Sequence, residues 1–354
     1  MRNQVKTILL VLCSLLVASL IVEGLARLFF PIWAPRTGRI TQFWQYNPRY
    51  GWSHIPLSNG SFSSYGFDTK VRINSKGFRG QETNYTRDGK FKRIVVLGDS
   101  FVWGFGVQED EMFTSRMEKQ IPNLEIVNLG VSGYSTDQEL LLYQEEGRKY
   151  EADLVVLLVA GNDFEGNMQT VHNFVYGKPA FVLQANGNLV LTNQPVVQAS
   201  WIMRTAVGLA SYSFVLTQIN RGLPHLKLNP MPGIDKEQVR SFPQSAAGEL
   251  TARLIMELNR SISQDGVQLL VAFVDGLGRR RGITSLLAQS NIDCLLLDDY
   301  LDHEDKSLRL PDRLHWSSKG HQAVARVLGD KIKEKFRVAS SSLTSPPKTT
   351  ASQN

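Results

Sequence analysis

The chain has 354 residues, 42% of them hydrophobic, so it can bury a full α/β core and lacks the composition of a disordered protein. Lys and Arg exceed Asp and Glu by only 39 to 33, and the excess is spread along the chain. Neither a basic helix nor a zinc-finger spacing is present, so we expect no nucleic-acid partner. The tightest basic cluster, Arg279–Arg281, is typical of a solvated loop; contact with an anionic polymer or lipid headgroup is the alternative.

The chain begins with an apolar segment, Thr7–Val22, that carries no charge and follows Arg2 and Lys6. At ~1.5 Å per residue, a helix of this length falls slightly short of a bilayer core of ~30 Å, and continuing it past Val22 makes up the length. Because basic flanks stay in the cytoplasm, the pattern predicts a membrane anchor over residues 1–33, with the remaining chain outside. A cleaved signal peptide is the alternative, since Val17-Ala18-Ser19 offers a small-residue cleavage site.

The region after the anchor divides into two parts. Residues 34–91 are rich in Gly, Ser, Asn and aromatic residues, which predicts an irregular strand-and-turn segment packed against the main domain. From residue 92 onward, short apolar strands alternate with helical patterns. We expect strands at 93–98, 124–129 and 153–160 and helices near 110–120 and 136–149. This alternation predicts a parallel sheet that is covered by helices on both faces.

The alternation stops after Gly161-Asn162-Asp163. Residues 164–244 are predicted to form an insertion, in which Asn186-Gly187 between two alternating runs indicates a β-hairpin. The α/β pattern then resumes, with the expected elements listed by position: helices at 245–264, 282–290 and 318–336, and strands at 267–274 and 292–297. Residues 339–354 have the composition of a disordered tail. The main domain is therefore expected over 92–338.

Three motifs fall at the carboxyl ends of predicted strands: Gly98-Asp99-Ser100, Asn128–Gly133 and Gly161-Asn162-Asp163. A fourth, Asp312-Arg313-Leu314-His315, lies before the last helix. Open α/β sheets build their sites at this edge, so the four motifs are expected to meet. Each motif alone has an ordinary structural explanation, since Asp and Ser commonly cap the turn after a strand. Their order and placement together indicate a site.

The chemistry of this site would centre on a serine. A serine hydroxyl is a poor nucleophile until a base takes its proton, and His315 is the candidate base. Asp312 can orient the distal nitrogen of that imidazole. The backbone N–H of Ser100, the backbone N–H of Gly130 and the side-chain amide of Asn162 are the candidate oxyanion donors. We expect Asp99 to shape the turn without a catalytic role, and we expect the other histidines to be structural: His54, His172, His225, His303 and His321.

The order of these motifs resembles that of the SGNH or GDSL hydrolase family of serine esterases, over Lys92–Val338. The resemblance implies a three-layer α/β/α, flavodoxin-like sheet with Ser100 as nucleophile. It also implies that Gly130 and Asn162 are oxyanion donors and that Asp312 and His315 complete the triad. Phe101 stands where many relatives have leucine. A membrane anchor ahead of the domain is similar to bacterial envelope members that act on acylated polysaccharides.

The resemblance implies an esterase that needs no metal or cofactor. A phosphate loop is excluded because Gly98–Gly104 lacks the Lys-Ser/Thr ending. A metallohydrolase using Asp99, Asp163, Asp312 and His315 would leave the serine unexplained. Two alternatives stay open: an O-acyltransferase using the same triad, and a membrane-tethered glycan-binding or assembly protein without turnover. The expected substrate is an acylated small molecule, lipid or polysaccharide, outside the cytoplasm.

Overall fold

A computed structural model describes residues 2–29, 40–64, 67–87, 89–172, 176–184, 186–202, 204–205, 213, 244–274, 282–302 and 304–343. Four of the sequence features lie wholly or mostly outside these ranges: the Arg279–Arg281 cluster, His225, His303 and the second half of the insertion.

The centre of the molecule is a five-stranded parallel sheet. Its strands lie side by side in the order β13 (Asp293–Leu296), β12 (Gln268–Phe273), β7 (Leu154–Val159), β5 (Lys92–Leu97) and β6 (Leu124–Asn128). Along the chain this is the 2-1-3-4-5 order of a flavodoxin-like sheet, which confirms the predicted fold class. The strand order reverses between β5 and β7, and such a reversal leaves a crevice at the carboxyl ends of the strands.

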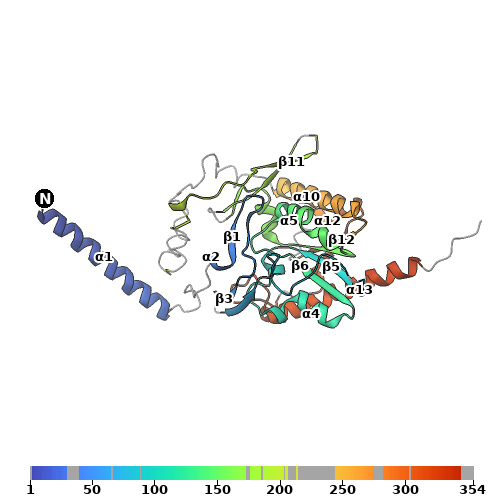
Figure 1. The fold of residues 1–354 in the computed structure, drawn as a ribbon, viewed down its shortest axis with the longest axis horizontal. Helices are drawn as coiled ribbons and strands as arrows, with labels where there is room; N and C mark the ends of the chain where they lie inside the picture. Colours follow the sequence, from blue (N-terminus) through green and yellow to red (C-terminus); the bar gives the residue numbers. More distant parts are fainter. Residues whose placement is uncertain are drawn as a thin grey trace, which may run out of the picture.

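Helices cover both faces of the sheet (Figure 1). One face carries α5 (Thr136–Glu145), α10 (Gln244–Gln264) and α12 (Ile283–Gln289), and the other carries α4 (Phe113–Gln120) and α13 (Ser318–Leu343). Alternate side chains of each strand therefore enter different cores. On β7, Val155 and Leu157 pack with the α10 side, whereas Val156 and Leu158 pack with the α13 side. Burial on both faces explains the continuous apolar runs in the sequence.

Residues 40–72 form a short helix and two antiparallel hairpins beside the sheet. The elements are α2 (Ile40–Phe43), β1 (Trp44–Asn47), β2 (Gly51–His54), β3 (Asn59–Ser64) and β4 (Phe67–Arg72). Phe43, Phe62 and Val71 of these elements form a third core cluster with Ile73 and with Trp103, three residues after Ser100. The described part of this segment thus packs against the main domain through Trp103.

The remaining elements are short. α3 (Ser100–Trp103) and α6 (Gly161–Gly166) follow β5 and β7. β8 (Val171–His172) pairs with β9 (Tyr176–Gly177), and β10 (Ala180–Leu183) pairs with β11 (Leu189–Thr192) around the predicted Asn-Gly turn. The 3-10 turns are η1 (Glu109–Glu111), η2 (Gly147–Tyr150), η3 (Leu297–Asp299) and η4 (Lys306–Leu308).

Two helix boundaries differ from those expected. The helix predicted over 136–149 ends at Glu145, and η2 replaces its last turn, where Gly147 packs closely against Tyr143. The last helix continues to Leu343, beyond residue 338, where the tail was predicted to begin. Extending an established helix costs little free energy even for a polar segment, because only nucleation is expensive.

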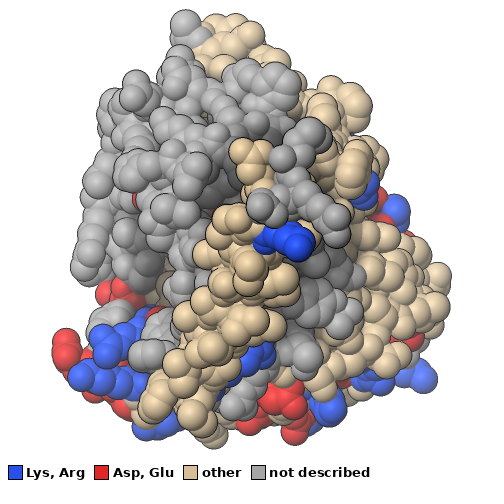
Figure 2. Space-filling model, turned by 90° about the vertical axis from the view of Figure 1, so that its left-hand side faces the viewer, with Lys and Arg blue, Asp and Glu red and all other residues tan. Residues whose placement is uncertain are grey.

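The first helix, α1 (Arg2–Phe29), projects from one side of the molecule (Figure 1). Its described side chains are almost all exposed, and Gln4–Phe29 is long and apolar enough to cross a membrane. A signal sequence satisfies the same criterion. In Figure 2, which views the molecule from the side of α1, basic and acidic side chains lie close together along the lower edge.

Candidate active site

Ser100 lies at the carboxyl end of β5, as the first residue of α3. The Asp99 side chain caps this helix, since its Oδ1 accepts a hydrogen bond of 3.0 Å from the backbone N–H of Phe101. Asp99 therefore shapes the turn, as expected. Ser100 is largely buried, with 9% of the residue exposed, and it lines a cleft.

Ser100, His315 and Asp312 form one hydrogen-bonded series. Ser100 Oγ lies 2.8 Å from His315 Nε2, and His315 Nδ1 lies 2.6 Å from Asp312 Oδ2. Asp312 Oδ1 also accepts hydrogen bonds from the backbone N–H groups of Leu314 and His315, at 2.9 and 3.1 Å. Residues 215 positions apart in the sequence thus meet at distances that permit proton transfer from the hydroxyl to the imidazole.

The environment of Asp312 favours its charged form. Burial raises the pKa of this carboxyl, but the hydrogen bonds from the His315 ring and from backbone N–H groups outweigh burial and lower the pKa below its usual value. The carboxylate is therefore ionised at neutral pH and can fix the orientation of the ring. The ring of Phe105 stacks on His315, with centroids 4.2 Å apart, and holds the imidazole from its face.

Asn162 follows β7 at the start of α6, across the sheet crevice from Ser100. Its Nδ2 donates a hydrogen bond of 3.0 Å to Asp99 Oδ2. An amide group carries two N–H bonds, so the second can donate to a ligand. Asp99 is buried, and burial raises the pKa of its carboxyl. The sequence does not predict the contact between Asp99 and Asn162. The two residues follow different strands, β5 and β7, and are far apart in the sequence.

Gly130 does not fit the predicted role of oxyanion donor. Its backbone N–H donates a hydrogen bond of 2.9 Å to Asn128 Oδ1. A Cβ at this position would lie 2.5 Å from the backbone nitrogen of Trp103, so the glycine allows the loop to pack against α3. Asn128 in the same motif could have suggested this, because Asn side chains commonly bond the backbone N–H two residues later.

Gly133, three residues later, lines the cleft together with Ser100 and Asn162. Its φ of +83° is a left-handed conformation that favours glycine, and a Cβ would lie 2.9 Å from His172 Nε2. Gly133 is thus the glycine of the motif that stands beside the serine. His172, expected to be only structural, also lines the cleft, and burial lowers its pKa to about 4.

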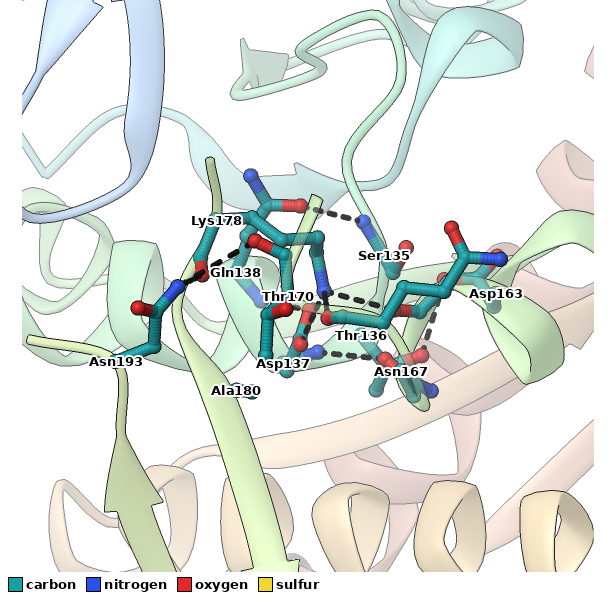
Figure 3. Close-up of polar contacts among 12 residues, drawn as sticks. Ser135, Thr136, Asp137, Gln138, Asp163, Asn167, Thr170, Lys178, Ala180 and Asn193 are labelled. Carbon is teal, nitrogen blue, oxygen red and sulfur yellow. Dashed lines mark hydrogen bonds and ion pairs between the residues drawn. The ribbon is translucent and has the colours of Figure 1, made fainter. Parts of the chain in front are cut away.

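A buried polar network holds α6, and with it Asn162 (Figure 3). Asp163 accepts hydrogen bonds from Thr136 Oγ1 and from the backbone N–H of Ala160, at 3.0 and 2.8 Å. Lys178, which comes from the insertion, forms a fully buried ion pair with Asp137 and donates to the backbone oxygen of Gly166 at 2.9 Å. The insertion, α5 and α6 are therefore tied together directly behind the site.

The N-terminal segment supports two other loops of the site. The buried guanidinium of Arg79 donates to the backbone oxygens of Trp103, Gly104 and Val107, at 3.0, 2.6 and 2.7 Å. These contacts fix the loop that carries Phe105 onto His315. Trp52 Nε1 donates to the backbone oxygen of Ser132 at 3.1 Å, beside Gly133. Residues 40–87 therefore position the site, a role that the sequence did not indicate.

The series opens into a cleft of about 1080 Å³. Residues that line it include Phe101, Phe105, Ser132, Gly133, Asn162, His172, Lys306, Arg309, Leu310, Arg313 and Leu314. Across the described parts of the chain, no three His, Cys, Asp or Glu side chains are grouped as metal ligands. Asp163, one member of the metal set considered above, instead points into the buried network.

The chain matches the description GDSL-like lipase/acylhydrolase family over residues 96–323, more than half of its length. A comparison with curated proteins found no match.

Three solved structures illustrate the structural likeness. A psychrotrophic esterase, EstA from a Pseudoalteromonas species, is 13% identical, with 70% of this chain and 99% of that one covered at a TM-score of 0.41. A GDSL-like lipase from Bacteroides thetaiotaomicron is 10% identical, with coverage of 72% and 93% and a TM-score of 0.41. A lipase/acylhydrolase from Enterococcus faecalis is 12% identical, with 69% and 97% covered at a TM-score of 0.37. From the family match and the sheet topology, the chain belongs to the GDSL-like lipase/acylhydrolase family.

Proposed function

We propose that the protein is a serine esterase that removes acyl groups from an acylated glycan through an acyl-enzyme intermediate on Ser100. The observation that carries this proposal is the series in which Ser100 Oγ lies 2.8 Å from His315 Nε2, and His315 Nδ1 lies 2.6 Å from Asp312 Oδ2. The membership in a family of ester hydrolases supports it. We propose that the acyl group transferred to Ser100 is acetyl or another short acyl group.

The reaction runs in two balanced steps. Ser100 Oγ attacks the ester carbonyl while His315 Nε2 takes the hydroxyl proton; the imidazolium then returns that proton to the departing alcohol, which leaves the acyl group on Ser100. Water attacks the acyl-enzyme while His315 Nε2 takes one of its protons; the bond to Ser100 Oγ then breaks, the imidazolium returns the proton to Ser100, and the carboxylic acid is released. Asp312 stays ionised throughout and stabilises the imidazolium.

The oxyanion formed in each step needs donors that are already in place. We assign this role to the backbone N–H of Ser100, the backbone N–H of Gly133 and the side-chain amide of Asn162. Asn162 is supported by its hydrogen bond to Asp99, which fixes the direction of the amide. Gly133 is supported by its place in the cleft, and it replaces Gly130 in this role.

The remaining organisation is also proposed. α1 anchors residues 1–33 in a membrane, the segment 34–91 braces the site, and the hydrolase domain of 92–338 carries the insertion 164–244. The domain lies on the outer side of that membrane, where a serine, a histidine and an aspartate need no cofactor or cytosolic energy source. Reporter fusions after residue 33 test this orientation; cytoplasmic reporter activity would exclude it.

A fluorophosphonate probe tests the catalytic assignment. Wild-type protein is expected to become labelled and to hydrolyse p-nitrophenyl acetate, and Ser100→Ala is expected to lose both, with a loss in kcat of ~10⁴-fold or more. Ser115→Ala, a serine on α4, is the matched control and retains both. Equal labelling of wild type and Ser100→Ala would disprove the proposal and favour a binding protein without turnover.

Hydrolysis and acyl transfer share the acyl-enzyme and differ only in whether water or a sugar hydroxyl attacks it. A chain-length series of p-nitrophenyl esters, measured with and without an acceptor sugar, separates the two. The proposal expects free acid as the main product at all acceptor concentrations. Acylated acceptor as the main product would identify a transferase.

A further inference from the structure

We infer that the alcohol part of the substrate is an anionic glycan, one that carries carboxylate, sulfate or phosphate groups near the ester. This inference rests on the proposed ester hydrolysis at Ser100. It concerns three basic side chains on the rim of the cleft, Lys306, Arg309 and Arg313, which we call the basic rim.

The basic rim comes from the loop that also supplies His315. Lys306 and Arg313 are exposed, and Arg309 is half-buried, with its Nη1 donating to the backbone oxygen of Leu314 at 2.7 Å. That bond fixes Arg309 against the backbone next to His315. The loop that brings His315 to Ser100 therefore also carries this positive charge.

Among the described residues, Lys306 and Arg313 form no salt bridge with a carboxylate, and the carboxylate of Asp312 in the same loop is engaged by His315. Of the cleft-lining residues in the described parts of the chain, Asp99 is the one carboxyl, and burial raises its pKa. Asp305 belongs to the same loop, but its carboxylate accepts hydrogen bonds from Ser307 and from Lys319 at 2.9 Å. It is therefore engaged with Ser307 of η4 and Lys319 of α13, and it is not among the residues that line the cleft.

Other hollows on the described surface provide an internal comparison. A cavity of about 830 Å³ near α4 is lined by bases such as Lys70 and Arg72 and also by acids such as Glu109 and Glu118. A smaller one beside α10 is lined by both an acid, Glu249, and a base, Arg253. The cleft at Ser100 differs from both, because the exposed charged side chains that line it are all basic. Clefts lined by one sign of charge concentrate ligands of the opposite sign.

The exposed, polar position of the basic rim favours a glycan over a lipid as the carrier of the negative charge. Lys306, Arg313 and Leu314 face solvent at the mouth, and Ser132, Asn162 and His172 supply polar groups inside. A hydrated chain with repeated negative charges can lie along such a mouth. The apolar side chains Phe101 and Phe105 pack against the His315 ring, so they offer a surface for a short acyl group beside Ser100.

Two substrates and two variants test this inference. Acetate release is measured from acetylated polygalacturonate, which is acidic, and from acetylated glucomannan, which is neutral, and the ratio of the two kcat/KM values is compared. We expect the ratio to fall about threefold in Lys306→Gln and in Arg313→Asn and about tenfold in the double variant, because exposed charge pairs contribute modestly. Asn is chosen because Arg313 has a φ of +61°.

Lys119→Gln, an exposed lysine in the mixed-charge cavity, is the matched control and leaves the ratio unchanged. Raising the salt concentration is expected to lower the ratio in wild type and to have little effect in the double variant. A ratio that the double variant does not alter would overturn the inference while leaving esterase activity intact. So would selective hydrolysis of anionic phospholipid vesicles without turnover of the acidic glycan. Absence of all ester hydrolysis, by contrast, would refute the proposed function itself.

Discussion

The carboxylate of Asp99 connects the two halves of the site. Its Oδ1 caps the helix of Ser100, and its Oδ2 accepts the amide hydrogen of Asn162 at 3.0 Å. A single side chain thereby sets the position of the nucleophile and the direction of an oxyanion donor. Asp99 acts through the helix of Ser100 and through the amide of Asn162, so we regard it as a positioning residue.

Asp99→Asn tests this role. Asn retains the ability to cap a helix but presents an N–H or a weaker acceptor to Asn162, so we expect kcat to fall about tenfold with little change in KM. Asn162→Ala is expected to cost about 10²-fold in kcat, the usual effect of losing one oxyanion donor. In the double variant the two losses should not add, because both act through one amide. Independent, fully additive losses in steady-state assays would refute the coupling.

At the scale of elements, the ion pair of Lys178 and Asp137 joins the insertion to α5 and α6 (Figure 3). Both side chains are at most 1% exposed, so neither charge is compensated by water. Buried pairs of this kind contribute little net stability when intact, but breaking one leaves an unpaired buried charge. The consequence here concerns function, because α6 carries Asn162.

Lys178→Met is therefore expected to lower the free energy of unfolding by about 3–5 kcal/mol in urea titrations. Adding Asp137→Asn removes the stranded charge, and the double variant should recover much of the loss. The same recovery is expected in kcat, because α6 regains its position. A double variant no more stable than Lys178→Met would show that the hydrogen bond to the Gly166 carbonyl, and not the charge pair, holds this junction.

At the scale of the whole molecule, the fold encloses several acids behind the site. Glu139 on α5 is fully buried, and within the described residues its carboxyl oxygens have no hydrogen-bond partner. Burial raises its pKa well above the ordinary value, and the nearby charges of Asp163, Asp99 and Asp137 raise it further. The carboxyl therefore tends to stay protonated in the folded state.

Glu139→Gln should change how stability depends on pH. Because the pKa is raised on folding, the folded state holds a proton that the unfolded state has lost above about pH 4.5. Stability then falls as pH rises from the unfolded pKa to the folded one, by at most ~1.4 kcal/mol per pH unit for one proton. The variant lacks this contribution. Its free energy of unfolding in urea, minus that of wild type, should therefore be larger at pH 9 than at pH 5.

The exposed Glu334→Gln on α13 serves as control and should leave the pH dependence unchanged. Buried His54 and His321, whose pKa values burial lowers to about 4 and about 3, destabilise the fold as pH falls below 6.5. They are present in wild type and variant alike, so their effect cancels in the difference. If the free energies of unfolding of Glu139→Gln and wild type differ by the same amount at all pH values, Glu139 is not protonated preferentially in the folded state.

The sequence by itself determined the layered fold and the three residues of the hydrogen-bonded series. Apolar strands alternating with helices specify a covered parallel sheet, and the ends of such strands meet at one edge, so Ser100 and Asn162 were predictable as neighbours. His315 was predictable as their partner from the Asp-x-x-His motif before the last helix, because a serine nucleophile needs a base. These inferences needed only local patterns and their order, because hydrophobic periodicity and the strand-end motifs are written in contiguous residues.

The tertiary structure decided which backbone and side-chain groups complete the site. The N–H of Gly130 is taken by Asn128, and the close packing of Gly130 on α3 leaves Gly133 beside Ser100. The bracing by Arg79 and the positive rim around the cleft likewise became visible only in three dimensions. Such features depend on the directions of individual hydrogen bonds and on contacts between distant segments, which no local pattern in a single sequence records.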